Sequence, residues 1–111
     1  MKLLRSIVAT ALAVVASASM AGQCEKVRFS DVGWTDITAT TALSSVVLEG
    51  LGYKPSTQML SVPVTYKSLE NGDIDIFLGN WMPTMEGDIR PYLNRGTVET
   101  VKTNLTGAKY T

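Results

Sequence analysis

Strand-like and helix-like segments alternate over most of this chain, and this alternation limits the folds that are open to it. The predicted strands are 27–32, 59–62, 74–78 and 98–101. The segments between them, 35–51, 64–70 and 84–95, carry helical spacing or helix-end signals. Because a helix between two strands is the usual crossover of a parallel sheet, this order predicts an α/β fold.

Apolar spacing predicts which faces of these segments are buried. One face of the first helix, which we expect to pack on the sheet, is made of Leu43, Val46, Val47 and Leu51. The short side chain of Thr35 or Asp36 is expected to cap the start of this helix. Segment 74–78 is nearly all apolar, which is typical of a central strand.

The first 21 residues have the layout of a secretory signal peptide. Lys2 and Arg5 give a positive start, an apolar run covers 7–16, and the small residues Ser19 and Ala21 precede the expected cut. The apolar run is shorter than the ~20 residues that a membrane span needs, although a short membrane anchor is the alternative. We therefore expect residues 22–111 to form a soluble periplasmic chain with one domain.

Two features near the ends of that mature chain bear on its extent. Cys24, the single cysteine, follows the expected cut and has three interpretations: a lipid attachment site, a disulfide partner for a cysteine outside this sequence, or a free thiol. At the other end, the chain reaches Thr111 without a terminal helix or strand. We expect it to be the truncated N-terminal portion of a longer domain.

Composition argues against several functional classes. The chain has no histidine and no glycine-rich phosphate loop, so we expect neither an enzyme nor a cofactor. Basic and acidic residues balance, whereas nucleic-acid binding calls for a basic patch. Asp73 and Asp75 could suggest a metal site, but a turn and a strand start explain them as well, and we expect no metal. Residues 104–106 fit the glycosylation sequon, which is a weak motif.

The two tryptophans are the most informative residues. Trp34 follows the first predicted strand and Trp81 follows the third, each one or two residues after a glycine at a strand-to-helix turn. Ligands of open α/β sheets bind outside the carboxyl ends of the strands, which is where both residues are expected. The alternative is that they fill the core. Tyr110 follows the fourth predicted strand and could reach the same edge, although its spacing alone does not decide this.

Aromatic walls without neighbouring Lys or Arg suit a quaternary ammonium, because the negative ring faces attract a cation that donates no hydrogen bond. Asp36 adds a carboxylate two residues after Trp34. It could face the ammonium, accept a hydrogen bond from a ligand hydroxyl, or only cap the helix.

These residues also carry a family resemblance. Residues 29–36 (FSDVGWTD) and 79–84 (GNWMPT) resemble motifs of the glycine betaine/choline substrate-binding proteins of ABC transporters. Within that family the chain is similar to the choline-binding branch, and the similarity continues through 61–66 (SVPVTY) and 104–111 (NLTGAKYT). Two tryptophan motifs in the same order make the resemblance specific, and it spans essentially the whole mature chain.

The resemblance implies a periplasmic-binding-protein fold of type II, with two α/β lobes around a cleft, of which this chain would form the N-terminal part of the first lobe. It also implies an aromatic box around the trimethylammonium group. Trp34, Trp81 and Tyr110 match three walls of that box, and Asp36 matches its acidic partner. The fourth wall and a polar residue for the ligand hydroxyl would come from the second lobe.

The function expected on these grounds is choline binding without catalysis, for delivery to a membrane permease. Glycine betaine or another betaine is the alternative ligand, and Asp36 separates the two, because it would repel a betaine carboxylate. An enzyme acting on choline or a sugar is a second alternative, and a truncated product without activity of its own is a third.

Overall fold

The computed structural model describes residues 25–109 and has the expected α/β organisation. Its elements, in chain order, are β1 (Lys26–Asp31), α2 (Thr35–Gly50), β2 (Lys54–Met59), α3 (Val62–Asn71), β3 (Ile76–Phe77) and α4 (Glu86–Arg95). The signal peptide, Cys24 and Tyr110, for which the sequence makes predictions, lie outside the described residues.

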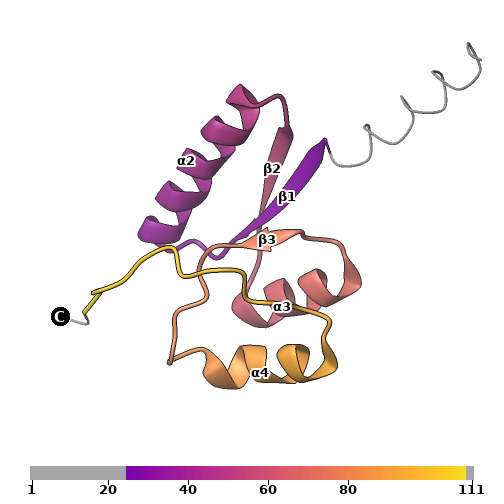
Figure 1. Cartoon of the computed structure of the whole chain (residues 1–111), viewed down its shortest axis with the longest axis vertical. Helices are drawn as coiled ribbons and strands as arrows, with labels where there is room; N and C mark the ends of the chain where they lie inside the picture. Colours follow the sequence, from indigo (N-terminus) through magenta and orange to yellow (C-terminus); the bar gives the residue numbers. More distant parts are fainter. Residues whose placement is uncertain (1–24, 110–111) are drawn as a thin grey trace, which may run out of the picture.

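The strands form a parallel sheet in the order β2-β1-β3 (Figure 1). All of β1 pairs with β2, from Lys26 opposite Lys54 to Asp31 opposite Met59. On its other side, β1 pairs only with the two residues of β3. The chain therefore crosses from β1 to β2 on one side of β1, and then crosses back over β1 to reach β3 on its other side.

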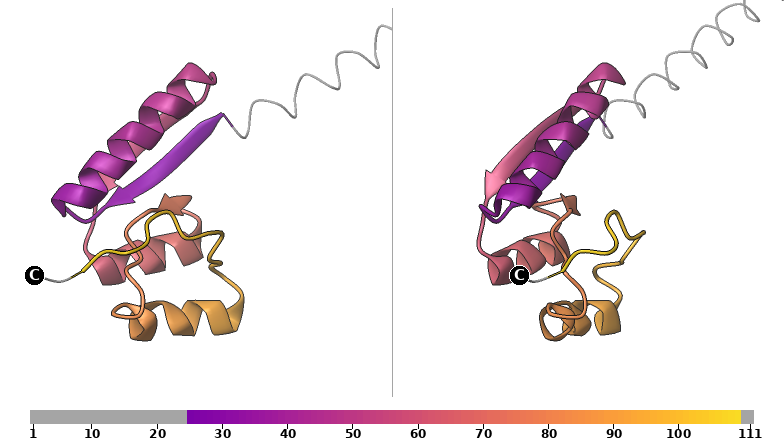
Figure 2. Two further views of the ribbon diagram at one scale, coloured as in Figure 1. Left: turned by 60° about the vertical axis from the view of Figure 1, so that its left-hand side comes forward. Right: turned by 90° about the vertical axis from the view of Figure 1, so that its left-hand side faces the viewer.

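This strand order places helices on both faces of the sheet, because parallel crossovers are right-handed. Figures 1 and 2 show α2 along β1 and β2, with α3 on the other side and α4 packed beneath α3. The buried apolar residues span both sides and are Phe29, Ile37, Tyr66, Ile74, Met85 and Ile89. No helix within residues 25–109 is long and apolar enough to cross a membrane.

Two strand predictions are wrong, and a third strand is shorter than predicted and not central. The second strand was expected at 59–62 but runs over Lys54–Met59, and Val62 instead opens α3 with Pro63 in its first turn. The prediction followed apolar residues, whereas β2 is polar and mostly exposed, so its pairing with β1 leaves no hydrophobic signal. Proline fits there because it has no backbone N–H, and N–H groups in the first turn of a helix have no acceptor within the helix.

The third predicted strand, 74–78, shortens to Ile76–Phe77 and lies at one side of the described sheet, where β1 is central. The apolar character of this segment does not depend on its being a strand, because Ile74 is 2% exposed although it lies outside β3. Residues 98–101 were expected to form a fourth strand, but they belong to no strand, and Val101 is 88% exposed.

The apolar face predicted for the first helix is also wrong. Ile37 and Thr41 are the buried residues of α2, and the helix turns them toward the sheet. The stripe that we expected to be buried is exposed and consists of Leu43 (67%), Val46 (65%), Val47 (55%) and Leu51 (68%). Both sides of α2 are apolar, so spacing alone could not identify the side that meets the sheet. We call these four exposed residues the α2 stripe.

Candidate functional site

Trp34 lies on a tight turn at the carboxyl end of β1. Gly33 turns the chain with a φ of +80°, a backbone conformation that residues with a side chain rarely adopt. Trp34 then takes the extended N-cap position (φ −84°, ψ 131°), from which α2 begins. Its side chain is not core filling, because the residue is 40% exposed.

A buried carboxylate holds this turn. Asp31 is only 3% exposed. One of its oxygens accepts the Gly33 N–H at 2.8 Å, and the other accepts the Thr38 hydroxyl at 2.7 Å. The Thr38 N–H in turn donates to the Trp34 carbonyl at 2.8 Å. The chain is therefore bonded on both sides of Trp34.

Asp36 lies in the first turn of α2, two residues after Trp34, and is exposed. The prediction that Thr35 or Asp36 caps the helix is wrong, because Trp34 is the N-cap and no side-chain hydrogen bond caps this start. A carboxylate is still favoured there by the positive end of the helix dipole. The Asp36 side chain is exposed to solvent, two residues from Trp34 in the chain.

Trp81 belongs to the turn that follows β3. It is half-buried and packs against the core cluster of Tyr66, Met85 and Ile89. Its N–H donates to the Met85 sulfur at 3.2 Å, and its carbonyl accepts the Met85 N–H at 2.8 Å. The preceding residue, Asn80, accepts a hydrogen bond from the Tyr66 hydroxyl at 2.7 Å. The start of α4 and the buried tyrosine together fix the position of this turn.

The structure brings both tryptophan turns to one edge of the sheet. β1 and β3 are neighbouring parallel strands, so the chain leaves both of them at the same edge. In Figures 1 and 2, the start of α2 and the segment between β3 and α4 lie on the same side of the molecule. This edge is where open α/β sheets bind their ligands.

Tyr110 lies outside the described residues, but the segment leading to it is fixed at this edge. The Asn104 side-chain amide donates to the Leu78 carbonyl, just beyond β3, at 3.1 Å. From there the last described residues run toward the start of α2 (Figure 1). Asn104, which the sequence presented only as part of a sequon, thus ties the C-terminal segment to the candidate site.

Sequence reasoning missed the residues that support the two tryptophans. A charged residue at the end of a buried strand was a signal for Asp31, because such a position needs bonded partners. Tyr66 was hidden in the apolar pattern of α3, and its hydroxyl could not be paired with Asn80 without the fold. No sequence signal indicated the bond made by Asn104.

Asp75, one of the two aspartates considered for metal, is bonded to Arg28. Asp75 accepts hydrogen bonds from the Arg28 backbone N–H at 2.8 Å and from the guanidinium Nε at 3.0 Å. A second guanidinium nitrogen lies 2.7 Å from its other oxygen. These bonds lower the pKa of the Asp75 carboxyl and join β1 to the start of β3. Among residues 25–109, no group of three or more acidic or cysteine side chains could hold a metal ion.

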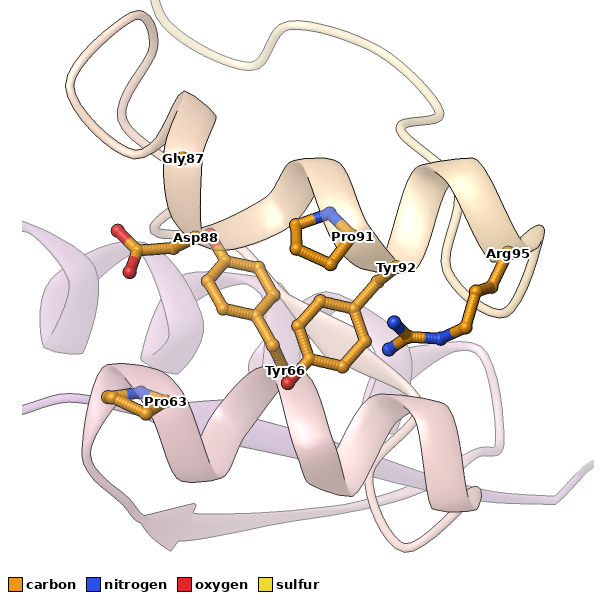
Figure 3. Close-up of a pocket in the computed structure, with 7 residues that line it drawn as sticks. All are labelled: Pro63, Tyr66, Gly87, Asp88, Pro91, Tyr92 and Arg95. Atoms are coloured by element: carbon orange, nitrogen blue, oxygen red, sulfur yellow. The ribbon is translucent and has the colours of Figure 1, made fainter.

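A surface pocket of about 330 Å³ lies between α3 and α4 (Figure 3), and neither tryptophan lines it. Its lining residues are Pro63, Tyr66, Gly87, Asp88, Pro91, Tyr92 and Arg95. The Tyr66 and Tyr92 rings stack with centroids 5.7 Å apart, and the Arg95 guanidinium covers the Tyr92 ring at 4.8 Å. Because a cation already occupies that ring face, the pocket does not suit a quaternary ammonium.

Known proteins resemble this chain in sequence and in fold. A protein of Chromohalobacter salexigens described as uncharacterized protein ORF1 is 56% identical over 93 residues, which are 84% of this chain and 60% of that protein. An ABC-transporter choline-binding protein, solved in complex with choline, is 67% identical with a TM-score of 0.65 over 66% of this chain. A second such structure, unliganded and semi-closed, is 68% identical with a TM-score of 0.73 over 79% of this chain.

The chain is shorter than these relatives. It spans 60% of the C. salexigens protein and 25% and 31% of the two choline-binding structures. Residues 25–111, which include both tryptophan turns, match the family described as the substrate-binding domain of ABC-type glycine betaine transport systems. With a match over that range, this chain belongs to the family of ABC-type glycine betaine substrate-binding domains.

Proposed function

We propose that this chain forms one side of a choline site in the substrate-binding component of an ABC importer, and that it binds its ligand without catalysis. Trp34 and Trp81 supply two aromatic walls, Tyr110 supplies a third, and Asp36 is the acidic partner. The observation that carries this proposal is the placement of both tryptophans after neighbouring parallel strands, at one edge of the sheet. A 67% identical relative solved with choline supports this choice of ligand.

The chemistry of the edge agrees with a methylated ammonium ligand. Trp34 is 40% exposed at a turn fixed by Asp31, so an indole face is presented to solvent on a rigid support. Asp36 places a negative charge in the adjacent helical turn. Choline offers a cation to the ring faces and a hydroxyl to the carboxylate, which matches both groups.

The affinity of this chain alone is expected to be low. An exposed cation–π wall contributes about 0.5–1 kcal/mol, so three walls open to water give roughly 2–3 kcal/mol. Micromolar binding needs about 8 kcal/mol. The remaining free energy has to come from further protein groups that close over the ligand and exclude water.

Titration of the chain with choline chloride, followed by NMR of the two indole N–H groups, tests the proposal. Both indole signals should shift, with half-saturation at about 10 mM or above. Sodium chloride at the same concentration is the control for ionic strength. Unshifted indoles at several hundred millimolar choline would refute the site, and micromolar saturation would mean that the chain closes its site in another way, such as by pairing with a second copy.

Glycine betaine is the second candidate, since the family description names this ligand. Its trimethylammonium group fits the same aromatic walls, but its carboxylate would lie near Asp36. The same titration with glycine betaine compares the two ligands directly.

The cellular setting belongs to the same proposal. A signal peptide over residues 1–21 would send residues 22–111 to the periplasm, where the domain would deliver its ligand to a membrane permease. The alternative, a truncated product without activity of its own, predicts that choline leaves both indole signals unchanged.

A further inference from the structure

Each tryptophan turn rests on a buried polar group that sequence reasoning did not assign. Asp31 lies beneath the Trp34 turn at 3% exposure, and Tyr66 lies beneath the Trp81 turn at 1% exposure. Neither residue is among the candidate ligand contacts. Burying such groups is costly unless they are hydrogen-bonded, so their partners indicate what they stabilise.

The partners of Asp31 lie on both sides of Trp34. Its carboxylate bonds the Gly33 N–H at 2.8 Å before the tryptophan and the Thr38 hydroxyl at 2.7 Å after it. The positive φ of Gly33, +80°, sets the direction in which the chain enters α2. The carboxylate therefore fixes the backbone from which the exposed indole projects.

Tyr66 acts on the second turn in a comparable way. Phe77 meets its ring edge-on, with centroids 5.9 Å apart, and Tyr92 stacks on it at 5.7 Å, so the hydroxyl has a fixed position. That hydroxyl donates to Asn80, the residue before Trp81, at 2.7 Å. Burial raises the pKa of the Tyr66 hydroxyl, which keeps its proton available for this bond at neutral pH.

We propose that Asp31 and Tyr66 are positioning residues of the ligand site, which hold the Trp34 and Trp81 walls, respectively, in the orientation that accepts a quaternary ammonium. This inference rests on the proposed function for its ligand. Its structural part, that each buried group controls one particular tryptophan, stands on the hydrogen bonds alone.

The chain contains two tryptophans, so each can be observed separately. Trp81→Phe leaves Trp34 as the only reporter, and Trp34→Phe leaves Trp81. Each background then receives two further substitutions. Thr38→Val removes the hydroxyl that donates a hydrogen bond to Asp31, and Tyr66→Phe removes the hydroxyl that donates one to Asn80. These substitutions nearly preserve volume, so they avoid the unfolding that loss of the Asp31 carboxylate could cause.

A matched control exists on the same strand and helix. Ser30 and Thr65 share a buried hydrogen bond of 2.6 Å that touches neither tryptophan turn. Thr65→Val removes a buried hydroxyl of the same kind. If stability loss alone mattered, this control would disturb the tryptophans as much as the other two variants do.

Time-resolved fluorescence anisotropy is the ligand-free readout, because it reports indole motion on the nanosecond scale. Thr38→Val should increase the fast component of Trp34 and leave Trp81 unchanged, and Tyr66→Phe should do the reverse. Thr38→Ser, which keeps the hydroxyl, should restore the rigidity of Trp34. Equal effects on both tryptophans, or an equal effect of Thr65→Val, would overturn the positioning role.

Choline titration of the chain with both tryptophans present is the second readout. Thr38→Val and Tyr66→Phe should each weaken choline binding by about fivefold, the equivalent of one neutral hydrogen bond, while Thr38→Ser and Thr65→Val should not. If the unsubstituted chain shows no choline response, the proposed function fails while anisotropy still decides the positioning role. If anisotropy changes as expected but choline affinity does not, the two residues do not position the ligand site.

Discussion

At the scale of single residues, Asp36 is the group expected to choose between ligands. It is exposed in the first turn of α2, beside Trp34, and a carboxylate on the ligand would meet it there. An exposed charge pair is typically worth about 0.2–1 kcal/mol, so Asp36 should favour choline over glycine betaine by roughly 1.4- to fivefold.

Asp36→Asn should therefore reduce the preference for choline by removing the repulsion of the betaine carboxylate. NMR titration with each ligand, at equal ionic strength, gives the ratio of dissociation constants for both proteins. Glu49→Gln, at the far end of the same helix, controls for the change in net charge. An unchanged ratio, or tighter betaine binding by the unsubstituted chain, would contradict this role.

The residues that face a ligand could be predicted from the sequence more readily than the residues beneath them. Trp34 follows Gly33 directly and Trp81 follows Gly79 by two residues, each after a strand-like segment, and local pattern was enough to place them after strands. Asp31 and Tyr66 act through partners up to 14 residues away, which only the fold brings together. Local sequence carries turn chemistry, but it does not carry the pairing of buried polar groups.

At the scale of secondary-structure elements, α2 gives the sharpest test of the packing. Ile37→Ala removes a side chain that is 4% exposed on the sheet side and should cost about 2–4 kcal/mol of unfolding free energy. Val46→Ala, which shortens a 65% exposed side chain of the α2 stripe, should cost less than about 0.5 kcal/mol. Urea unfolding of both variants measures the difference, and equal losses would mean that the α2 stripe is covered in solution.

An ion-pair cluster between α3 and α4 should make the free energy of unfolding depend on pH in the acid range. Glu70, near the end of α3, binds Lys67 at 2.8 Å and the Arg95 guanidinium of α4 at 2.7 Å. Bonds from Lys67 and then Arg95 lower the pKa of Glu70 from 4.5 to about 2. A carboxylate with a lowered pKa stabilises the fold above its unfolded pKa and loses that effect as pH falls toward its folded pKa.

The free energy of unfolding of the unsubstituted chain should therefore exceed that of Glu70→Gln at pH 7, and the gap should narrow as pH falls from 4.5 toward 2. Urea unfolding of both proteins across this range is the measurement. Asp75, whose pKa is also lowered, is present in both proteins, so its contribution cancels in the difference. A gap that does not vary with pH would show that Glu70 acts by packing and not by charge.

The alternation of strands and helices was predictable here, but the positions of two strands, the element boundaries and the buried faces were not. Alternation gave the parallel α/β fold because each helix must return the chain to the start of the next strand. The six polar or weakly apolar residues of β2 offered no strand pattern, and their pairing with β1 depends on backbone bonds that any sequence can make. Two apolar sides on α2 made its buried face undecidable from spacing.

At the scale of the whole molecule, export is the property that the sequence predicts. In a bacterial host the chain should be cleaved after Ala21 and recovered from the periplasm with Gly22 at its start, as N-terminal sequencing would show. Val14→Asp, which interrupts the apolar run, should keep the precursor uncleaved. Cys24→Ser should leave mass and location otherwise unchanged, whereas loss of a lipid-sized mass would identify Cys24 as an anchor.

The α2 stripe has a consequence for how long the protein survives in a cell. Folding factors and quality-control proteases act on exposed apolar surface, and this stripe offers three large side chains on α2 and a fourth, Leu51, at its C-cap. Whatever covers the stripe also hides it from that surveillance. Polar substitutions such as Val46→Ser would then lengthen the cellular half-life of the uncovered chain. They would affect this half-life more than they affect the affinity of the chain for any ligand.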